Sequence, residues 1–138
     1  MEPDSQTVWA EYVQRKRAAR LAEAEQVWSA LVAGGADAET VLAIDFVHFG
    51  PSKPGAEKLA EQLAENCTVA LEDGPDGYWL IKGTTRPYGV TLSAEDHLAW
   101  VDFMCEVSAS HGCVFSTWSL SAPTLDLSVQ SEAFECGG

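Results

Sequence analysis

Basic side chains are scarce in this sequence of 138 residues: eight Lys and Arg stand against 21 Asp and Glu, giving a formal net charge of −13. Such a surface repels phosphate backbones and anionic membranes, so direct binding of nucleic acid or of a membrane is disfavoured. It attracts basic surfaces and speeds encounters with them, although solubility alone also accounts for acidity. After Gly35 the imbalance grows, because only Lys53, Lys58, Lys82 and Arg86 are basic there.

Long apolar runs are also missing. No stretch approaches the roughly 18 apolar residues that indicate a membrane-spanning helix. The acidic start, residues 1–12, lacks the apolar segment of a signal peptide. We therefore expect a cytoplasmic protein. No CxxC pair occurs, so we expect free thiols in a reducing compartment at all four cysteines, Cys67, Cys105, Cys113 and Cys136.

The short motifs of common catalytic and nucleotide-binding sites are absent, since no GxGxxG, Walker loop, GxSxG or HExxH occurs. Cys105, His111 and Cys113 could meet at a helix-to-strand corner. A zinc site needs a fourth ligand and usually tighter paired spacing, so core thiols and a helix-end imidazole are favoured. We expect no catalytic residue, no metal and no cofactor.

Hydrophobic periodicity predicts one long helix followed by a mixed domain. Residues 5–33 carry the i, i+3, i+4, i+7 pattern of a buried helical stripe, and Gly34-Gly35 ends it. Further helices begin near Ser52 and at Ser93, which can act as an N-cap. Strands are predicted over residues 41–49, 68–72, 78–84 and 113–120.

The order strand-helix-strand-strand-helix-strand predicts an α+β, ferredoxin-like βαββαβ antiparallel sheet with an additional N-terminal helix. Because the strand 41–49 is fairly apolar on both sides, we expect the N-terminal helix to cover the second face of the sheet. The domain boundaries are 1–35 for that helix, 36–120 for the ferredoxin-like domain and 121–138 for a C-terminal tail, in which alternating Leu125, Leu127 and Val129 favour a short edge strand.

Acidic side chains near one turn are the leading binding candidates. GPDG at 74–77 is a turn signal between two strands. The carboxylates of Glu72, Asp73 and Asp76 surround it, and Glu95 and Asp96 at a helix start are second choices. In so acidic a chain, paired acids are mostly solvated, and nothing in the sequence places them in a catalytic cleft.

Two further features have competing interpretations. The run RKRAAR at 15–20 could contact RNA or an acidic partner, but a solvated helix face that neutralises the chain's own acids is favoured.

Aromatic residues on a ferredoxin-like sheet can mark an RNA-binding module. Here the strand YWLIKGT lacks the RNA-binding pattern and the charge has the wrong sign. We therefore expect these aromatic residues to fill the core or to meet the N-terminal helix: Phe46, Phe49, Trp79, Phe115 and Trp118.

Three stretches together resemble the regulator of ribonuclease E activity B family, the ribonuclease E inhibitors. They are LVAGGADAETVLAIDFVHFG (31–50), the helix AEKLAEQLAE (56–65) with the hairpin CTVALEDGPDGYWLIKGT (67–84) that follows it, and HLAWVDFMCEVSASHGCVFSTW (97–118). The resemblance covers roughly residues 20–120. It implies a ferredoxin-like fold that binds the endoribonuclease or its scaffold region, without catalysis or cofactor. The chain departs from the family at Ser116-Thr117, where an acidic residue is common, and in its N-terminal extension and tail.

Three functions follow as hypotheses. The first is a non-catalytic protein-binding regulator that resembles inhibitors of ribonuclease E and modulates RNA decay. The second is an immunity or antitoxin-type protein that neutralises a basic toxin enzyme. The third is a small enzyme with an active thiol.

Overall fold

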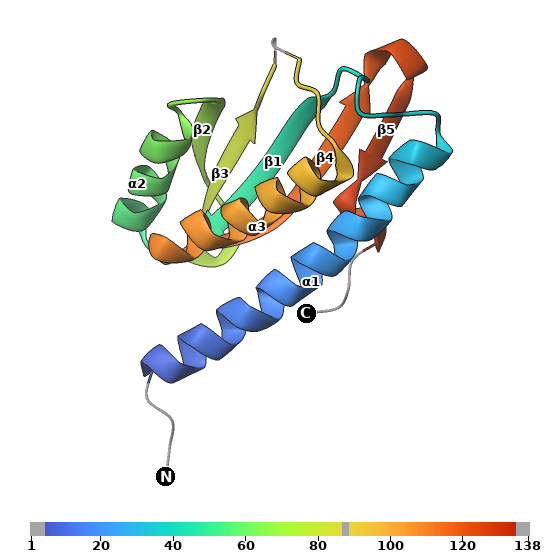
Figure 1. Ribbon diagram of the computed structural model, residues 1–138. Coiled ribbons are helices and arrows are strands. Elements are labelled where there is room, and N and C mark those ends of the chain that lie inside the picture. The colour runs from blue at the N-terminus through green and yellow to red at the C-terminus, as the bar shows by residue number, and fades with distance from the viewer. Residues whose placement is uncertain (1–4, 87–88, 135–138) are drawn as a thin grey trace.

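The computed structural model describes residues 5–86 and 89–134, and within these ranges the chain forms one antiparallel five-stranded sheet and three α-helices (Figure 1). The fold is therefore mixed α+β. The elements in chain order are α1 (Ser5–Ala33), β1 (Ala43–Gly50), α2 (Lys53–Leu63), β2 (Thr68–Asp73), β3 (Trp79–Thr84), α3 (Ala94–Ser110), β4 (Val114–Ala122) and β5 (Leu127–Gln130).

The strands lie in the order β2-β3-β1-β4-β5, with β1 in the centre. Every neighbouring pair is antiparallel, and Phe46 of β1 lies opposite Gly83 of β3 and Trp118 of β4. A Cβ atom on Gly83 would lie only 2.2 Å from the Phe46 ring, so the close approach requires glycine. In the tail, β5 pairs with β4 and extends the sheet.

Local sequence signals account for the helix starts. The Ser52 side chain accepts a hydrogen bond from the Gly55 N–H at the start of α2, at 3.4 Å. The predicted start of α3 is confirmed, because the Ser93 side chain accepts from the Asp96 N–H at 3.0 Å and the Asp96 carboxylate accepts from the Ser93 N–H at 3.3 Å. This capping box satisfies two N–H groups that the helix itself leaves unpaired.

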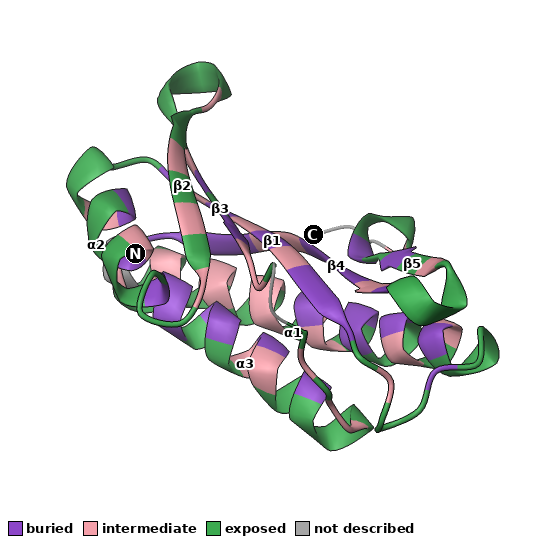
Figure 2. Cartoon of the chain, turned by 90° about the horizontal axis from the view of Figure 1, so that it is seen from above, coloured by how far each residue is buried: buried purple, intermediate pink, exposed green. Residues whose placement is uncertain are grey.

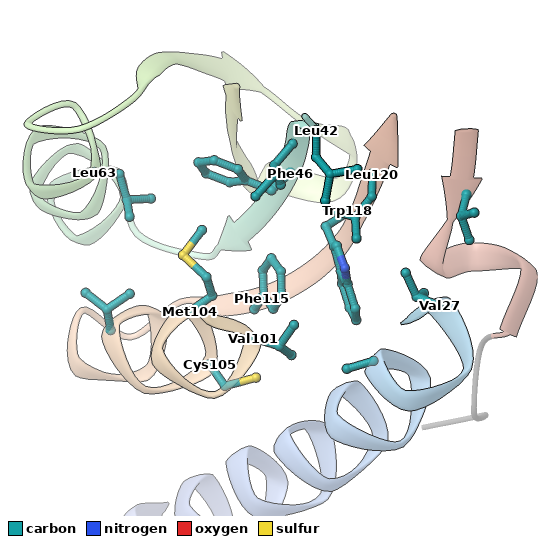
Figure 3. Close-up of a cluster of buried hydrophobic side chains, with 14 of the residues drawn as sticks. Val27, Leu42, Phe46, Leu63, Val101, Met104, Cys105, Phe115, Trp118 and Leu120 are labelled. Atoms are coloured by element: carbon teal, nitrogen blue, oxygen red, sulfur yellow. The ribbon is translucent and has the colours of Figure 1, made fainter. Parts of the chain in front are cut away.

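The core lies between the sheet and the helices. Phe46, Phe115 and Trp118 extend from β1 and β4 toward α3, where Met104 and Val101 meet them (Figure 3). Phe115 and Trp118 stack with ring centroids 5.3 Å apart. Each such side chain stabilises the fold by about 1.5–3 kcal/mol through removal of apolar surface from water.

The prediction that α1 covers the second face of the sheet is wrong. Instead, α1 runs alongside α3 on the helical side of the molecule (Figure 1). Arg17 forms an ion pair with Asp102 at 2.6 Å, and Trp28 stacks on His97 with ring centroids 5.5 Å apart. The sequence pattern of α1 indicates which side is buried, but not that α3 is the element that buries it.

Candidate functional site

The acidic hairpin predicted from the sequence forms the turn between β2 and β3. Its backbone is closed by two hydrogen bonds, from the Gly74 N–H to the Tyr78 carbonyl at 2.8 Å and from the Tyr78 N–H to the Pro75 carbonyl at 3.1 Å. Asp76 has a φ of 57°, in the left-handed region, which Asp tolerates better than most residues. Figure 2 shows this hairpin projecting from the body with its turn exposed.

The three hairpin carboxylates have different surroundings, although all three residues are exposed. Glu72 forms an ion pair with Lys82 of β3 at 3.3 Å, and both side chains are about half exposed. Such an exposed pair contributes only roughly 0–1 kcal/mol to stability. Asp73, at the end of β2, and Asp76, in the turn, therefore carry the charge at the tip that is open to a partner.

The second pair of predicted binding residues lies elsewhere. Glu95 and Asp96 are in the first turn of α3, where the Asp96 carboxylate is used in the capping box. Negative charge there also complements the partial positive charge of a helix N-terminus. The hairpin turn lies next to Gly50, at one end of β1. The start of α3 lies near the other end of β1, because Val90, just before α3, pairs with Leu42. The structure thus separates the two groups of acids.

Polar residues form one row across the sheet face opposite the helices. One row of directly paired residues crosses all five strands and contains only polar side chains: Thr68, Thr84, Asp45, Ser119 and Gln130. A groove of about 440 Å³ lies over this row. The outer face of β1 is polar at Asp45, whose strand neighbours are hydroxyl residues, and apolar at Val47 and Phe49, which are half-buried. Phe49 lies on this face against Tyr78, with ring centroids 5.7 Å apart, and not in the core.

The groove contains charges of both signs. Lys82, Asp45 and Glu132 line it. Arg86, just after β3, reaches Asp45 at 3.4 Å, and Lys82 reaches Glu72 at 3.3 Å. The groove can therefore offer hydroxyl and amide groups for hydrogen bonds, while Lys82 and Asp45 are already in local ion pairs. It lies over the end of β2 and β3 at Thr68 and Thr84, whereas the hairpin turn is at the other end of these strands.

Buried histidines belong to the core. His48 Nδ1 lies 3.0 Å from the Ser108 hydroxyl oxygen, and His97 Nε2 accepts a hydrogen bond from Trp118 Nε1 at 3.2 Å. Burial lowers the pKa of His48 to about 3 and the pKa of His97 to about 4. Both rings are neutral at pH 7, and both are within 1% of complete burial, so neither can exchange a proton with a substrate at the surface.

The cysteines that the structure describes carry thiols and not thiolates. Burial raises the pKa of Cys105 to about 12, that of Cys113 to about 11, and that of Cys67 above its usual value. A thiol with a raised pKa is a poor nucleophile at neutral pH. Cys136 lies outside the described residues.

The corner of Cys105, His111 and Cys113 is occupied by other contacts. His111 Nε2 lies 2.8 Å from Gln62 Oε1, and the Cys113 thiol points at the His111 carbonyl, 3.6 Å away. Across residues 5–86 and 89–134, no group of three or more His, Cys, Asp or Glu side chains is arranged to hold a metal ion.

A scan against protein-family models and a search of the curated proteins find no match for this chain. In the described part of the chain, no helix combines the length and the apolar character needed to cross a membrane. The resemblance of residues 20–120 to ribonuclease E inhibitors thus stays a prediction from the sequence.

The basic run 15–20 holds α1 in place. Arg17 pairs with Asp102 of α3, and Arg20 is buried, where its Nη1 donates to the Ser116 carbonyl at 2.6 Å and lies 3.2 Å from Glu23. Arg15 and Lys16 lie over the Tyr12 ring, with their charged groups 5.8 and 5.4 Å from its centroid. The favoured interpretation as a solvated face is therefore wrong for Arg20 and holds best for Arg15.

Sequence reasoning missed the polar row on the open face. Alternation alone could have indicated it, because Asp45 sits between apolar neighbours in its strand, and Thr117, Ser119 and Ser121 stand at every second position of β4. What the sequence does not contain is the strand register that aligns these residues.

Proposed function

We propose that this chain is a non-catalytic, cytoplasmic, protein-binding regulator that recognises a basic surface, and that its partner is ribonuclease E or its scaffold region. The family resemblance over residues 20–120 motivates the choice of partner. As part of this proposal we assign a ferredoxin-like arrangement to the domain. The order β2-β3-β1-β4 with antiparallel pairing throughout supports that assignment, and β5 and α1 are additions to it.

The observation that carries the proposal is how the charges are distributed. Five of the eight basic residues form ion pairs with acids of the same chain: Arg17, Arg20, Lys53, Lys82 and Arg86. Among the described acids Glu23 is buried, Asp45 and Asp102 are half-buried, and the others are exposed. The surface therefore keeps a large surplus of carboxylates, which complements a partner rich in arginine and lysine.

We assign the contact to the β2–β3 hairpin, through Asp73 and Asp76 with Glu72 beside them. The hairpin projects from the body, so a partner can reach it from several sides (Figure 2). Asp76 is fixed by the turn backbone, which lowers the entropy lost when a partner binds. Glu95 and Asp96 remain a second, weaker contact, because Asp96 already serves the helix cap.

Binding to purified ribonuclease E tests the proposal. The variant carries Glu72→Lys, Asp73→Lys and Asp76→Lys, and the matched control carries the same charge change at exposed acids elsewhere, Glu25→Lys, Glu39→Lys and Glu61→Lys. Surface plasmon resonance at several salt concentrations gives the rates. We expect the hairpin variant to lose association rate and most of its salt dependence, and the control to lose much less.

An RNA cleavage assay supplies the functional readout. The wild-type chain should slow cleavage by ribonuclease E, and the hairpin variant should not. Absence of binding and of inhibition by the wild-type chain would refute the choice of partner. Equal losses in both triple variants would show that net charge, and not the hairpin, governs recognition. Inhibition of a basic toxin enzyme encoded beside this gene, without effect on ribonuclease E, would favour the immunity or antitoxin alternative.

A further inference from the structure

The first turns of α1 extend beyond the rest of the molecule. Along α1, Trp28 stacks on His97, Arg17 pairs with Asp102, and Val13 lines a small cavity with Ala109. The two helices are thus antiparallel, and α3 ends at Ser110. Residues 5–12 continue past that end for about 12 Å, as Figure 1 shows. We call residues 5–12 the overhang.

The overhang carries apolar surface. Val8 is 51% exposed, and Trp9 and Tyr12 are half-buried, stacked on each other with ring centroids 5.8 Å apart. Trp9 and Val13 continue the stripe that buries Ala24, Val27 and Leu31 further along α1. Burial of this exposed apolar surface by an apolar partner would stabilise the end of α1.

A cleft between α2 and α3 offers such a partner surface. Its volume is about 250 Å³, and the residues that line it are Gln62, Leu63, Glu65, Asn66, Cys67, Trp100, Phe103 and Met104. Phe103 is 50% exposed, unusual for so large an apolar side chain. The volume is below the roughly 300–1,000 Å³ of small-molecule sites. A cleft of this size can hold one large side chain of a protein partner, together with parts of the residues beside it.

Basic residues follow soon after the overhang and the cleft is acidic, whereas the overhang itself contains one acid, Glu11. Arg15 and Lys16 follow the overhang and flank Tyr12. The cleft is lined by Glu65, and exposed Glu106 lies one turn beyond Phe103 on a helix, α3, that contains no Lys or Arg. At 0.15 M salt the Debye length is about 8 Å, so long-range repulsion between two acidic copies is largely screened. Ion pairs formed in direct contact then determine whether the two copies associate.

We propose that the chain self-associates, with Trp9 and Tyr12 from the overhang of one copy docking in the α2–α3 cleft of a second copy. Arg15 and Lys16 of the first copy then lie against Glu65 and Glu106 of the second. Reciprocal docking gives a two-fold dimer in which the contact occurs twice, which suits the preference of homo-oligomers for closed symmetry. The proposal does not depend on the basic partner argued above.

Sedimentation equilibrium on the full chain tests this directly. Wild type should approach twice the mass of one chain as concentration rises. Trp9→Glu and Phe103→Glu should each weaken self-association by about tenfold or more, because buried aromatic anchors dominate interfaces. Leu125→Glu is the matched control, since Leu125 is 39% exposed in the turn between β4 and β5. It should behave as wild type.

Mixing the two variants gives the sharper result. An equimolar mixture of Trp9→Glu and Phe103→Glu keeps one intact contact, between the overhang of the second variant and the cleft of the first. The mixture should therefore associate more tightly than either variant alone. A mixture as monomeric as its components, or a wild-type chain that stays monomeric up to millimolar concentration, would overturn the proposal.

Discussion

Acidification should destabilise this protein through its two buried histidines. The His48 ring is enclosed by Phe46 and Phe115, with centroids 5.6 and 4.9 Å away, and His97 lies between Trp28 and Trp118. Burial holds the pKa of His48 at about 3 and that of His97 at about 4 in the folded chain. In the unfolded chain both should titrate near 6.5.

The size and sign of the effect follow from linkage. Because the folded pKa values are lowered, the unfolded chain binds more protons below pH 6.5, and stability falls as pH falls. Each histidine costs about 1.4 kcal/mol per pH unit in that range. At pH 5, 1.5 units below 6.5, the loss is therefore about 2 kcal/mol per histidine and about 4 kcal/mol in total. Such a loss is a large part of a typical stability of about 5–15 kcal/mol.

Urea unfolding between pH 7 and pH 5 measures this dependence. We expect the plot of unfolding free energy against pH to flatten by about 1.4 kcal/mol per pH unit in His48→Gln, and equally in His97→Gln. Ser108→Ala is the control, because it removes the hydrogen-bond partner of His48 without removing a titrating group. Ser108→Ala should lower the unfolding free energy at every pH without changing the slope of its dependence on pH. A slope that survives both histidine substitutions would refute the burial argument.

Three further outcomes are expected. Native Cys105 and Cys113 should react with iodoacetamide at pH 8 much more slowly than in urea, because burial raises both pKa values; rapid native labelling would revive the active-thiol hypothesis. Gly83→Ala should destabilise the fold by about 1–3 kcal/mol in urea unfolding, since its Cβ would lie 2.2 Å from the Phe46 ring. Ser93→Ala should cost about 1 kcal/mol in the same assay through loss of the α3 cap, whereas Ser93→Thr should keep most of it.

The sequence predicts local structure well wherever a residue type has one dominant use. Ser93 with Asp96 three residues later indicates the start of α3, and GPDG at 74–77 indicates the hairpin turn. The buried stripe of α1 is also visible as Ala24, Val27 and Leu31. These features depend on neighbours within one or two helical turns or one hairpin, and such neighbours are fixed by the chain itself.

Features that depend on tertiary pairing could not be predicted in the same way. Arg20, as part of the basic run 15–20, is expected to be solvated. It is buried, because it pairs with buried Glu23 and reaches the Ser116 carbonyl, which is 96 residues away. The polar row through Asp45 needs the register of four strand pairs. A charge pattern reports composition along the chain, whereas burial and register are set by contacts between distant elements.

One end of the molecule brings the two proposed interactions together. The β2–β3 hairpin lies beside Gly50, where β1 ends, and α3 ends at Ser110 just before β4 begins on the other side of β1. The overhang of α1 passes that same end. This end of the molecule therefore carries both the acidic hairpin turn and the part of α1 near the basic residues Arg15 and Lys16. A basic partner bound at the hairpin and a second copy docked at this end would occupy neighbouring space, although they contact different carboxylates. We expect the two associations to compete, so that dilution below the self-association range should strengthen partner binding.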